Sequence, residues 1–312
     1  MSEENKLNAP WLIAVWPGMG QVAINAGFYL AAKLEMGVFA EFSPMELFDV
    51  DHVLVEHGII RPARLPRSRL FLWRDPQEKR DLILFIGEAQ PPQGKRAFCR
   101  GLIEIARNFG VEQIFTFAAM ATAMHPQHRS NVFVAATDET TLDDVSLLDV
   151  KILKEGHIGG LNGVLLGEVA QAGLHGVCLL GEMPHIFAQL PFPAGSLAVL
   201  RIFCEIAKLK LDFSELEQQS AQLGEQLGEL LAKVEGDLGE SNPMETQAEA
   251  EESEVEEPPK VSLRDEQRIE QLFSQASQDR SKAYELKQEL DRLGIFADYE
   301  DRFLDLFKSA NA

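Results

Sequence analysis

Polar side chains in this chain follow apolar runs at positions where an α/β sheet places a binding or catalytic site. Glu88 directly follows one such run and Glu182 follows another, while Asn162 and Glu168 lie in the segment before the second run. Ligands of open α/β sheets bind outside the carboxyl ends of the strands. We therefore expect Asn162, Glu168 and Glu182 to belong to or border the working end, with Glu88 converging on it. Glu88 or Glu182 would act as a general base if burial raised its pKa.

A competing interpretation assigns these carboxylates a structural role, in which they cap turns and pair with arginines. A candidate partner is the basic loop 61–69, which carries four arginines. The loop itself has two interpretations: a solvated connection, or a loop that binds an anion or contacts another subunit.

A second candidate feature is the turn Pro17-Gly18-Met19-Gly20, which leads from an apolar run into an apolar helix. Gly18 and Gly20 allow a sharp turn at a helix start, where free N–H groups can hold an anion. The third glycine of a dinucleotide fingerprint is missing. A tight turn packed against a neighbour therefore competes with a phosphate-binding loop, and no cofactor is predicted.

The sequence offers no convincing nucleophile or metal ligand set. It has no GxSxG motif, and its three cysteines, Cys99, Cys178 and Cys204, are far apart, as expected of reduced packing thiols. His125 and His128 have Pro126 between them and no third ligand nearby, which favours loop histidines over a metal site.

Short apolar runs that alternate with helical segments predict an α/β fold with an open sheet. Gly173 ends the helix that follows the turn Gly159–Gly163, and the run after it reads as a strand buried on both faces. We expect strands at 11–16, 38–42, 52–60, 70–73, 82–87, 113–117, 132–136 and 176–181, and helices at 21–34, 96–109, 164–172, 195–208 and 213–235.

The acidity of the chain is concentrated in its last third. The net charge is −20, and residues 211–312 hold 26 acidic and 10 basic side chains. We expect an α/β domain over residues 8–235, an acidic disordered linker over 236–260 and a C-terminal helical segment over 261–312. The last segment is small for an independent core, so we expect it to dock on the main domain or on another subunit.

The composition also indicates which partners and which cellular location to expect. An acidic chain repels phosphate backbones, which argues against nucleic-acid binding. The polar N-terminus lacks a signal-peptide pattern, and no apolar run approaches the ~20 residues that span a bilayer. We therefore expect a cytoplasmic protein without a membrane anchor.

Four stretches together resemble the proteasome assembly chaperone type-2 (PAC2) family in its prokaryotic branch: PGMGQVAINAGFYLAAKL from Pro17, DLILFIGEAQPP from Asp81, GHIGGLNGVLLGEVAQAG from Gly156 and GVCLLGEMPH from Gly176. The likeness covers roughly residues 8–235. The resemblance implies an α/β fold in three layers, αβα, with a mixed sheet like that of nucleoside phosphorylases and peptidyl hydrolases. It also implies that the chain forms homo-oligomers, with a trimer as one candidate size. Some relatives of the family escort proteasome α-subunits. The hydrophobic–Tyr–any-residue ending of archaeal relatives that engage proteasome particles does not match Lys308 to Ala312.

Two functions therefore compete. The first is a non-enzymatic oligomeric protein that binds itself and a protein client, in the manner of an assembly chaperone. The alternative is a small-molecule-binding or hydrolase/phosphorylase-like enzyme that uses Gly18, Gly20 and the carboxylates at the strand ends. A third hypothesis concerns the C-terminal helices, which it interprets as a tethered docking arm.

Overall fold

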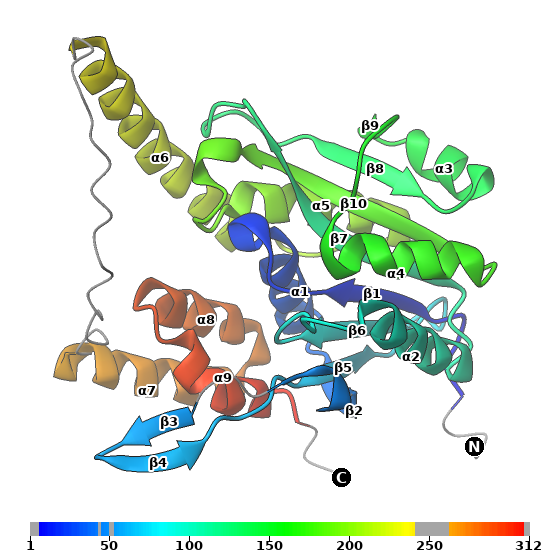
Figure 1. The fold of residues 1–312 in the computed structure, drawn as a ribbon, viewed down its shortest axis with the longest axis horizontal. Helices are drawn as coiled ribbons and strands as arrows, with labels where there is room; N and C mark the ends of the chain where they lie inside the picture. Colours follow the sequence, from blue (N-terminus) through cyan, green and yellow to red (C-terminus); the bar gives the residue numbers. More distant parts are fainter. Residues whose placement is uncertain (1–5, 43–44, 50–52, 241–261, 309–312) are drawn as a thin grey trace.

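A mixed eight-stranded sheet forms the centre of the molecule (Figure 1). The structure is a computed structural model, and it describes residues 6–42, 45–49, 53–240 and 262–308. The strands lie in the order β2-β5-β6-β1-β7-β10-β8-β9. Their bounds are β1 Trp11–Val15, β2 Gly37–Phe42, β5 Ser68–Trp73, β6 Leu82–Gly87, β7 Gln113–Thr122, β8 Val132–Ala136, β9 Lys151–Ile152 and β10 His175–Pro184.

The four central strands, β6, β1, β7 and β10, run parallel, and antiparallel partners flank them on both sides. Every residue of β1 and β6 is buried, because helices cover both faces of this part of the sheet. The wholly apolar runs of the sequence therefore form the centre of the sheet, as predicted. The run predicted at 176–181 is the first part of β10, which extends to Pro184 and carries Glu182 inside the strand.

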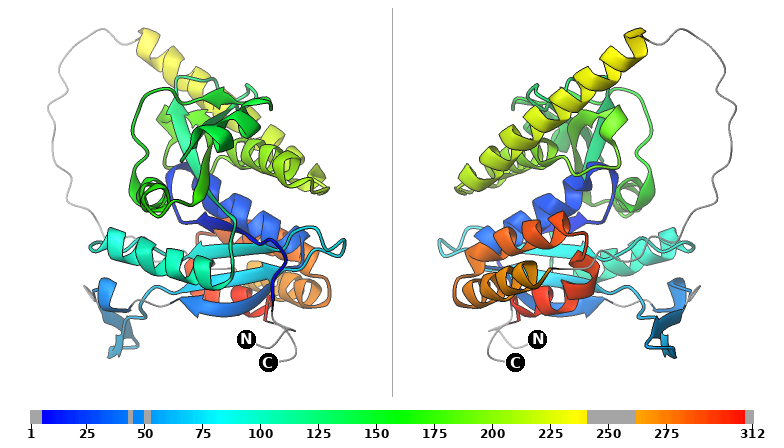
Figure 2. Two further views of the ribbon diagram at one scale, coloured as in Figure 1. Left: turned by 90° about the vertical axis from the view of Figure 1, so that its right-hand side faces the viewer. Right: turned by 90° about the vertical axis from the view of Figure 1, so that its left-hand side faces the viewer.

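Helices pack on both faces and make three layers (Figure 2). Alternate strand residues point to opposite faces, so Ile13 and Val15 contact one helical layer while Leu12 and Ala14 contact the other. The first layer holds α1 (Val22–Lys33), α5 (Pro193–Ala207) and α6 (Ser214–Glu240); the second holds α2 (Lys95–Asn108) and α4 (Gly160–Gln171). A short helix, α3 (Glu139–Ser146), packs beside β8 and β10.

The segment predicted as one strand at 52–60 is instead a β-hairpin outside the main sheet. Strands β3 (Val53–Glu56) and β4 (Ile59–Pro62) form a separate two-stranded sheet. The connecting His57 and Gly58 both have positive φ, 52° and 78°, which is the backbone of a type I′ hairpin turn. The hairpin projects from the body of the molecule in Figures 1 and 2.

Helix α6 packs closely on the loop between β7 and β8. Its glycines permit this approach, because a Cβ on Gly224 would lie 3.2 Å from the Pro126 carbonyl oxygen and one on Gly228 would lie 2.9 Å from Gln127. The helix continues to Glu240, past the predicted domain end at 235. Most of the predicted linker 236–260 lies outside the described residues.

The C-terminal helices pack on the layer that contains α1. They are α7 (Leu263–Gln278), α8 (Ala283–Arg292) and α9 (Phe296–Asp305), and a short 3₁₀ turn at 280–282 joins α7 to α8. Other 3₁₀ turns of the chain lie at 45–47 and 185–187. Phe28 of α1 makes edge contacts with Phe296 and Phe303 at ring distances of 5.5 Å. The Val38 amide donates to the Phe307 carbonyl at 2.8 Å, so this segment also pairs with edge strand β2.

Candidate functional site

The predicted glycine turns meet at one edge of the sheet. We call this edge the carboxyl-end rim: the segments 16–21, 87–90, 122–131 and 184–192, which follow β1, β6, β7 and β10. Gln90 joins two of the turns to the start of α4, because its Oε1 accepts from the Leu161 amide at 3.0 Å and its Nε2 donates to the Pro17 carbonyl at 3.4 Å. Gly18, Gly87 and the turn 159–163 therefore do gather on one rim.

The turn is packed at Gly20, and the amides of Gly20 and Gln21 already donate to backbone carbonyls. Gly20 has φ 58°, its amide donates to the Ala188 carbonyl at 2.8 Å, and its own carbonyl accepts from the Phe192 amide at 2.8 Å. A Cβ at Gly20 would lie 2.7 Å from the Met183 sulfur. The geometry favours the tight packed turn over the phosphate-binding loop.

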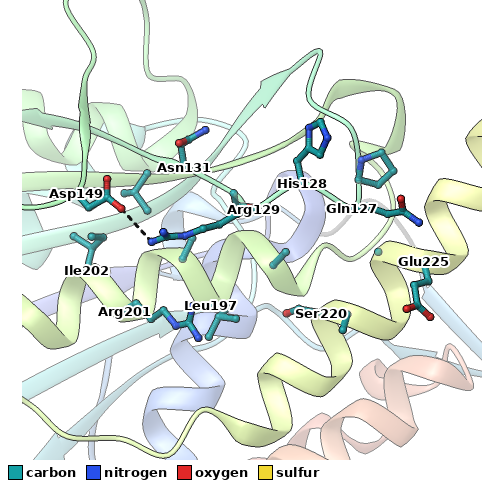
Figure 3. A pocket seen from close by; sticks show the side chains of 17 residues that line it. Gln127, His128, Arg129, Asn131, Asp149, Leu197, Arg201, Ile202, Ser220 and Glu225 are labelled. Carbon is teal, nitrogen blue, oxygen red and sulfur yellow. Dashed lines mark hydrogen bonds and ion pairs between the residues drawn. The ribbon is translucent and has the colours of Figure 1, made fainter.

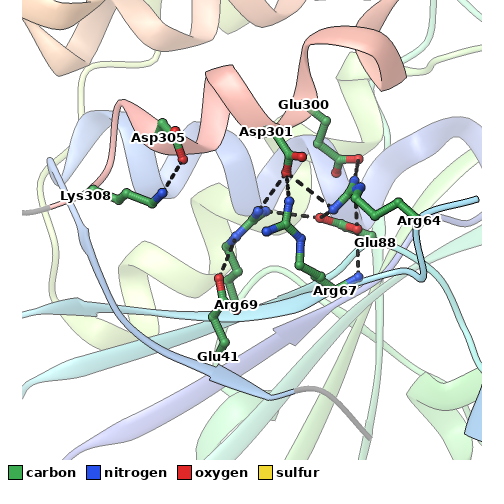
Figure 4. A network of polar contacts seen from close by, with 9 residues as sticks. All are labelled: Glu41, Arg64, Arg67, Arg69, Glu88, Glu300, Asp301, Asp305 and Lys308. Carbon is green, nitrogen blue, oxygen red and sulfur yellow. Dashed lines mark hydrogen bonds and ion pairs between the residues drawn. The ribbon is translucent and has the colours of Figure 1, made fainter. Parts of the chain in front are cut away.

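Glu88 is held by arginines of the loop 61–69 (Figure 4). Its carboxylate lies 3.1 Å from Arg69 Nη1 and 3.2 Å from Arg64 Nη2, and it accepts from the Arg67 amide at 2.7 Å. The Glu88 side chain is 7% exposed and the Arg69 side chain is 4% exposed. Charge-assisted bonds of this kind occupy both carboxylate oxygens, so Glu88 has the structural role that the competing interpretation assigned to it.

The same arginines also bind acidic residues of α9, and no local pattern in the sequence pairs the two segments. Asp301 lies 3.0 Å from Arg69 Nη2 and 3.3 Å from Arg64 Nη1, and it also accepts from Arg67. Its neighbour Glu300 lies 3.8 Å from Arg64. Burial, and then the nearby charge of Glu88, raise the pKa of Glu300 to about 7. The basic loop is thus covered by the chain's own C-terminal helix.

Glu182 has three hydrogen-bond donors on the rim. Its Oε1 accepts from Thr122 Oγ1 at 2.9 Å, and its Oε2 accepts from the Asn131 amide at 3.3 Å and from the Asn131 side chain. Burial alone would raise the pKa of Glu182, but bonds from Asn131 and Thr122 outweigh it and the pKa is lowered. This environment does not favour a general base.

Glu168 does not lie on the rim. It sits in the middle of α4 and faces α2, where it accepts from Arg96 Nε at 2.6 Å and from Arg100 Nε at 2.7 Å. The bonds from Arg100 and then Arg96 lower the pKa of its carboxyl group. The two arginines are four residues apart on one face of α2, a spacing that signals such a clamp between helices.

The candidate polar residues therefore do not converge. Glu88 follows β6 and Glu182 lies in β10, which are three strands apart, or about 14 Å at the usual strand spacing. Asn162 occupies the first turn of α4, half-buried, and its Oδ1 has no hydrogen-bond partner among the described residues. No general base, nucleophile and anion-binding turn come together at the rim within the described part of the chain.

A groove that the sequence did not indicate lies between the rim segment 126–131, the start of β8, α5 and α6 (Figure 3). Its volume is about 640 Å³, and none of the six candidate residues lines it. Ala194, Leu197 and Ala198 supply apolar lining. Its arginines are engaged, since Arg129 pairs with Asp149 at 3.1 Å and Arg201 pairs with Glu217.

The cysteines behave as packing residues. Cys99, Cys178 and Cys204 are all buried and free. Burial raises the pKa of each thiol to about 12, which keeps it protonated near neutral pH. Among the residues that the structure describes, no group of three or more His, Cys, Asp or Glu side chains is arranged to hold a metal ion. Nor does any described helix have the length and apolar character needed to cross a bilayer.

The fold and the rim define a three-layer α/β protein whose rim carboxylates are bound by its own side chains and backbone. Comparison with protein families places it more narrowly. The PAC2 family model matches residues 12–231, and the chain belongs to this family. The resemblance found in the sequence is confirmed.

Solved structures with the same fold support this assignment. The chain is similar to PbaB, an archaeal proteasome activator from Pyrococcus furiosus, with 27% identity and a TM-score of 0.60 over 73% of this chain and 94% of that one. It is also similar to a PAC2 family protein from Streptomyces avermitilis, with 24% identity and a TM-score of 0.61 over 71% and 95% of the two chains. Among curated sequences it is similar to the uncharacterized protein MJ1210 of Methanocaldococcus jannaschii, with 25% identity over 73% of this chain and 84% of that one.

Proposed function

We propose that this chain is a non-enzymatic, homo-oligomeric protein that binds and escorts a protein client during assembly, in the cytoplasm. Membership of the PAC2 family supports the proposal, as does the similarity to PbaB, which is described as a proteasome activator. A further structural relative is PbaA of Pyrococcus furiosus, described as an archaeal homologue of a proteasome-assembly chaperone, with 23% identity and a TM-score of 0.56.

The observation that carries the proposal is the state of the candidate carboxylates. Each carboxylate that would serve an enzyme is bound inside the protein: Glu88 by arginines, Glu182 by Asn131 and Thr122, and Glu168 by α2. A general base needs a pKa near the working pH, and those of Glu168 and Glu182 are lowered instead. The alternative function, a hydrolase or phosphorylase, therefore gains no support from these side chains.

Quantitative affinity capture of the full chain from its native host, followed by mass spectrometry, tests the proposal. We expect at least one protein client in a fixed ratio to the bait. In parallel, the melting temperature of the purified chain is measured with inorganic phosphate and with nucleosides, and we expect no shift.

Gly18→Val is the matched control for the second measurement. Gly18 has an extended backbone with φ −169°, and a Cβ there would meet nothing within 4 Å, so the substitution is compatible with the fold. Its added methyl groups would nevertheless crowd an anion held at this turn. Capture without any stoichiometric partner, together with a phosphate-induced shift that Gly18→Val removes, would contradict the proposal in favour of the enzyme.

A further inference from the structure

A pocket with four basic side chains lies at the edge of the sheet opposite the carboxyl-end rim, where β6 begins and α1 and α5 end. We call it the basic pocket. It has a volume of about 670 Å³, and its charged lining side chains are Asp75, Lys79, Arg80, Lys208 and Lys210. Four of these are basic and one is acidic, so the pocket has an excess of three positive charges in a chain whose net charge is −20. Such a local excess attracts anionic groups.

In the described part of the chain, none of the four cations of the basic pocket forms an ion pair. The one carboxylate is bound by the backbone of its own loop, because Asp75 accepts from the amides of Gln77 at 2.9 Å, Lys79 at 3.1 Å and Arg80 at 3.3 Å. The bond from the Gln77 amide is the main cause that lowers the pKa of Asp75. Asp75 therefore fixes the loop 75–80 and leaves the four cations without a counterion.

Arg80 shows most directly that the basic pocket favours an anion. Its guanidinium carbon lies 3.5 Å from the centre of the Trp11 ring, and its buried Nε has no hydrogen-bond partner among the described residues. Burial lowers the pKa of Arg80, and the charge of Glu112 only partly offsets this effect. A partly buried cation without a bonded counterion is costly, so a carboxylate that reaches Arg80 gains a charge-assisted hydrogen bond.

The rest of the lining indicates what kind of anion fits. Half-buried apolar side chains lie between the cations: Leu34, Trp73 and Leu209. The cations come from two segments, 79–80 and 208–210, and not from one turn. The amides of the loop 75–80 that donate to Asp75 are not free to surround a single phosphate. Carboxylates spaced along a peptide, with an apolar side chain between them, match this lining better than one compact anion.

We propose that the basic pocket binds an acidic peptide segment of the protein client, in which Asp or Glu residues flank an apolar side chain. Charge complementarity selects this occupant, because the pocket offers four cations without ion pairs around an apolar lining. The inference deepens the proposed function and rests on it, since it assigns client binding to a named surface. The chain's own acidic stretch 249–257 has a similar charge, so the binding experiment must distinguish it from a client segment.

Fluorescence anisotropy with the full chain and a labelled peptide tests the pocket. The probe is a short fluorescein-labelled peptide with glutamates on both sides of one phenylalanine, and the control peptide has glutamine in place of each glutamate. We expect the probe to bind with an affinity that falls as the salt concentration rises, and the control peptide not to bind. Lys79→Gln/Lys210→Gln should weaken probe binding about 5- to 10-fold, because it removes two of the four cations.

The matched control variant is Lys151→Gln/Lys154→Gln, which removes the same charge from two exposed lysines outside the pocket. We expect it to bind the probe as tightly as the wild type does. Lys79 and Lys210 are exposed as well, so both double variants should keep the wild-type melting temperature. Arg80→Gln should also weaken binding, and the lysine variants decide the question if Arg80→Gln does not fold.

Several results would overturn the proposal. One is equal probe binding by the wild type and Lys79→Gln/Lys210→Gln, and another is an equal loss in the control variant. Displacement of the probe by an equal concentration of inorganic phosphate would assign the pocket to a small anion. A wild type that binds no probe, while Glu251→Gln/Glu252→Gln/Glu254→Gln binds it, would make the chain's own acidic stretch the occupant.

Affinity capture with Lys79→Gln/Lys210→Gln separates this inference from the proposed function. A client captured in the same ratio by this variant and by the wild type overturns the inference and leaves the escort function intact. Absence of any client with the wild type refutes the escort function itself, and with it the inference. We expect the wild type to capture the client and Lys79→Gln/Lys210→Gln to retain markedly less of it.

Discussion

Removing the charge of Glu300 is expected to stabilise the docked C-terminal helices at neutral and alkaline pH. Glu300 is mostly buried against Arg64, with its side chain 16% exposed, and its pKa rises from 4.5 to about 7. The folded protein therefore holds this proton more tightly than the unfolded chain does. The stabilising contribution of the protonated carboxyl is fully present below pH 4.5, and it is lost as the pH rises through 7.

The magnitude follows from the two pKa values. One pKa unit corresponds to about 1.4 kcal/mol, so the interval from 4.5 to about 7 corresponds to roughly 3 kcal/mol. Glu300→Gln keeps the size of the side chain and removes the charge. We expect its free energy of unfolding to exceed that of the wild type by about 2–3 kcal/mol at pH 8 and to match it near pH 4.5.

Urea unfolding followed by far-UV circular dichroism at several pH values between 4.5 and 8 measures this difference. Hydrogen exchange of the α8 and α9 amides shows whether the gain lies in the docked helices. Asp301→Asn is the control, because Asp301 accepts from Arg67 and Arg69 and its loss is expected to destabilise the same contact at pH 8. If Glu300→Gln is no more stable than the wild type at pH 8, the arginines already balance the charge of Glu300 and the reasoning is refuted.

Three other predictions address packing. Lys287 is fully buried and donates to Asn25 at 3.0 Å and to Asp291. Asp291→Asn should therefore lower the free energy of unfolding in urea by about 3 kcal/mol, because it leaves a buried charge without its partner. Adding Lys287→Met should recover most of that loss, and a double variant as unstable as Asp291→Asn would contradict this. A Cβ at Gly181 would lie 2.5 Å from the Gly195 carbonyl oxygen, so Gly181→Ala should lower stability by about 1–3 kcal/mol. Gly167 lies in open space on α4, so Gly167→Ala should raise the free energy of unfolding by about 0.5–1 kcal/mol. If Gly181→Ala proves more stable than Gly167→Ala, the backbone at Gly195 moves to accept the new methyl group and the packing argument is wrong. The three cysteines should resist a thiol reagent at pH 8 until the chain unfolds, since burial raises the pKa of each to about 12; rapid labelling of the native protein would disprove the burial argument.

The central strands of the sheet can be predicted from the sequence, because a strand buried on both faces is a continuous apolar run. Strand β6 coincides with the predicted run 82–87, and each of its residues is buried. Such runs need no knowledge of distant residues, since a strand covered by helices on both sides is apolar at every position. Parallel strands put their carboxyl ends at the same edge, which is why the turns that follow β1 and β6 lie on one rim.

The roles of the candidate site residues depended on partners that local patterns do not reveal. The contact of α9 with the loop 61–69 joins residues more than 200 positions apart. Nothing in the sequence of either segment indicates that the other is its partner. The β3–β4 hairpin was missed for a different reason. His57 adopts a positive φ that non-glycine residues seldom take, so the sequence pattern predicts one strand over 52–60. Glu168 was recoverable, because Arg96 and Arg100 already showed helical spacing.

Native mass spectrometry of the full chain, purified from its host without chelators or denaturants, tests the central claim that this PAC2-family protein acts through protein contacts. The account predicts a homo-oligomer, part of it carrying a protein client at a fixed ratio. It also predicts that no small anion is retained by the wild type and lost from Gly18→Val. A bare monomer, or a bound phosphate or nucleoside that Gly18→Val releases, would contradict the account and assign the rim to small-molecule chemistry.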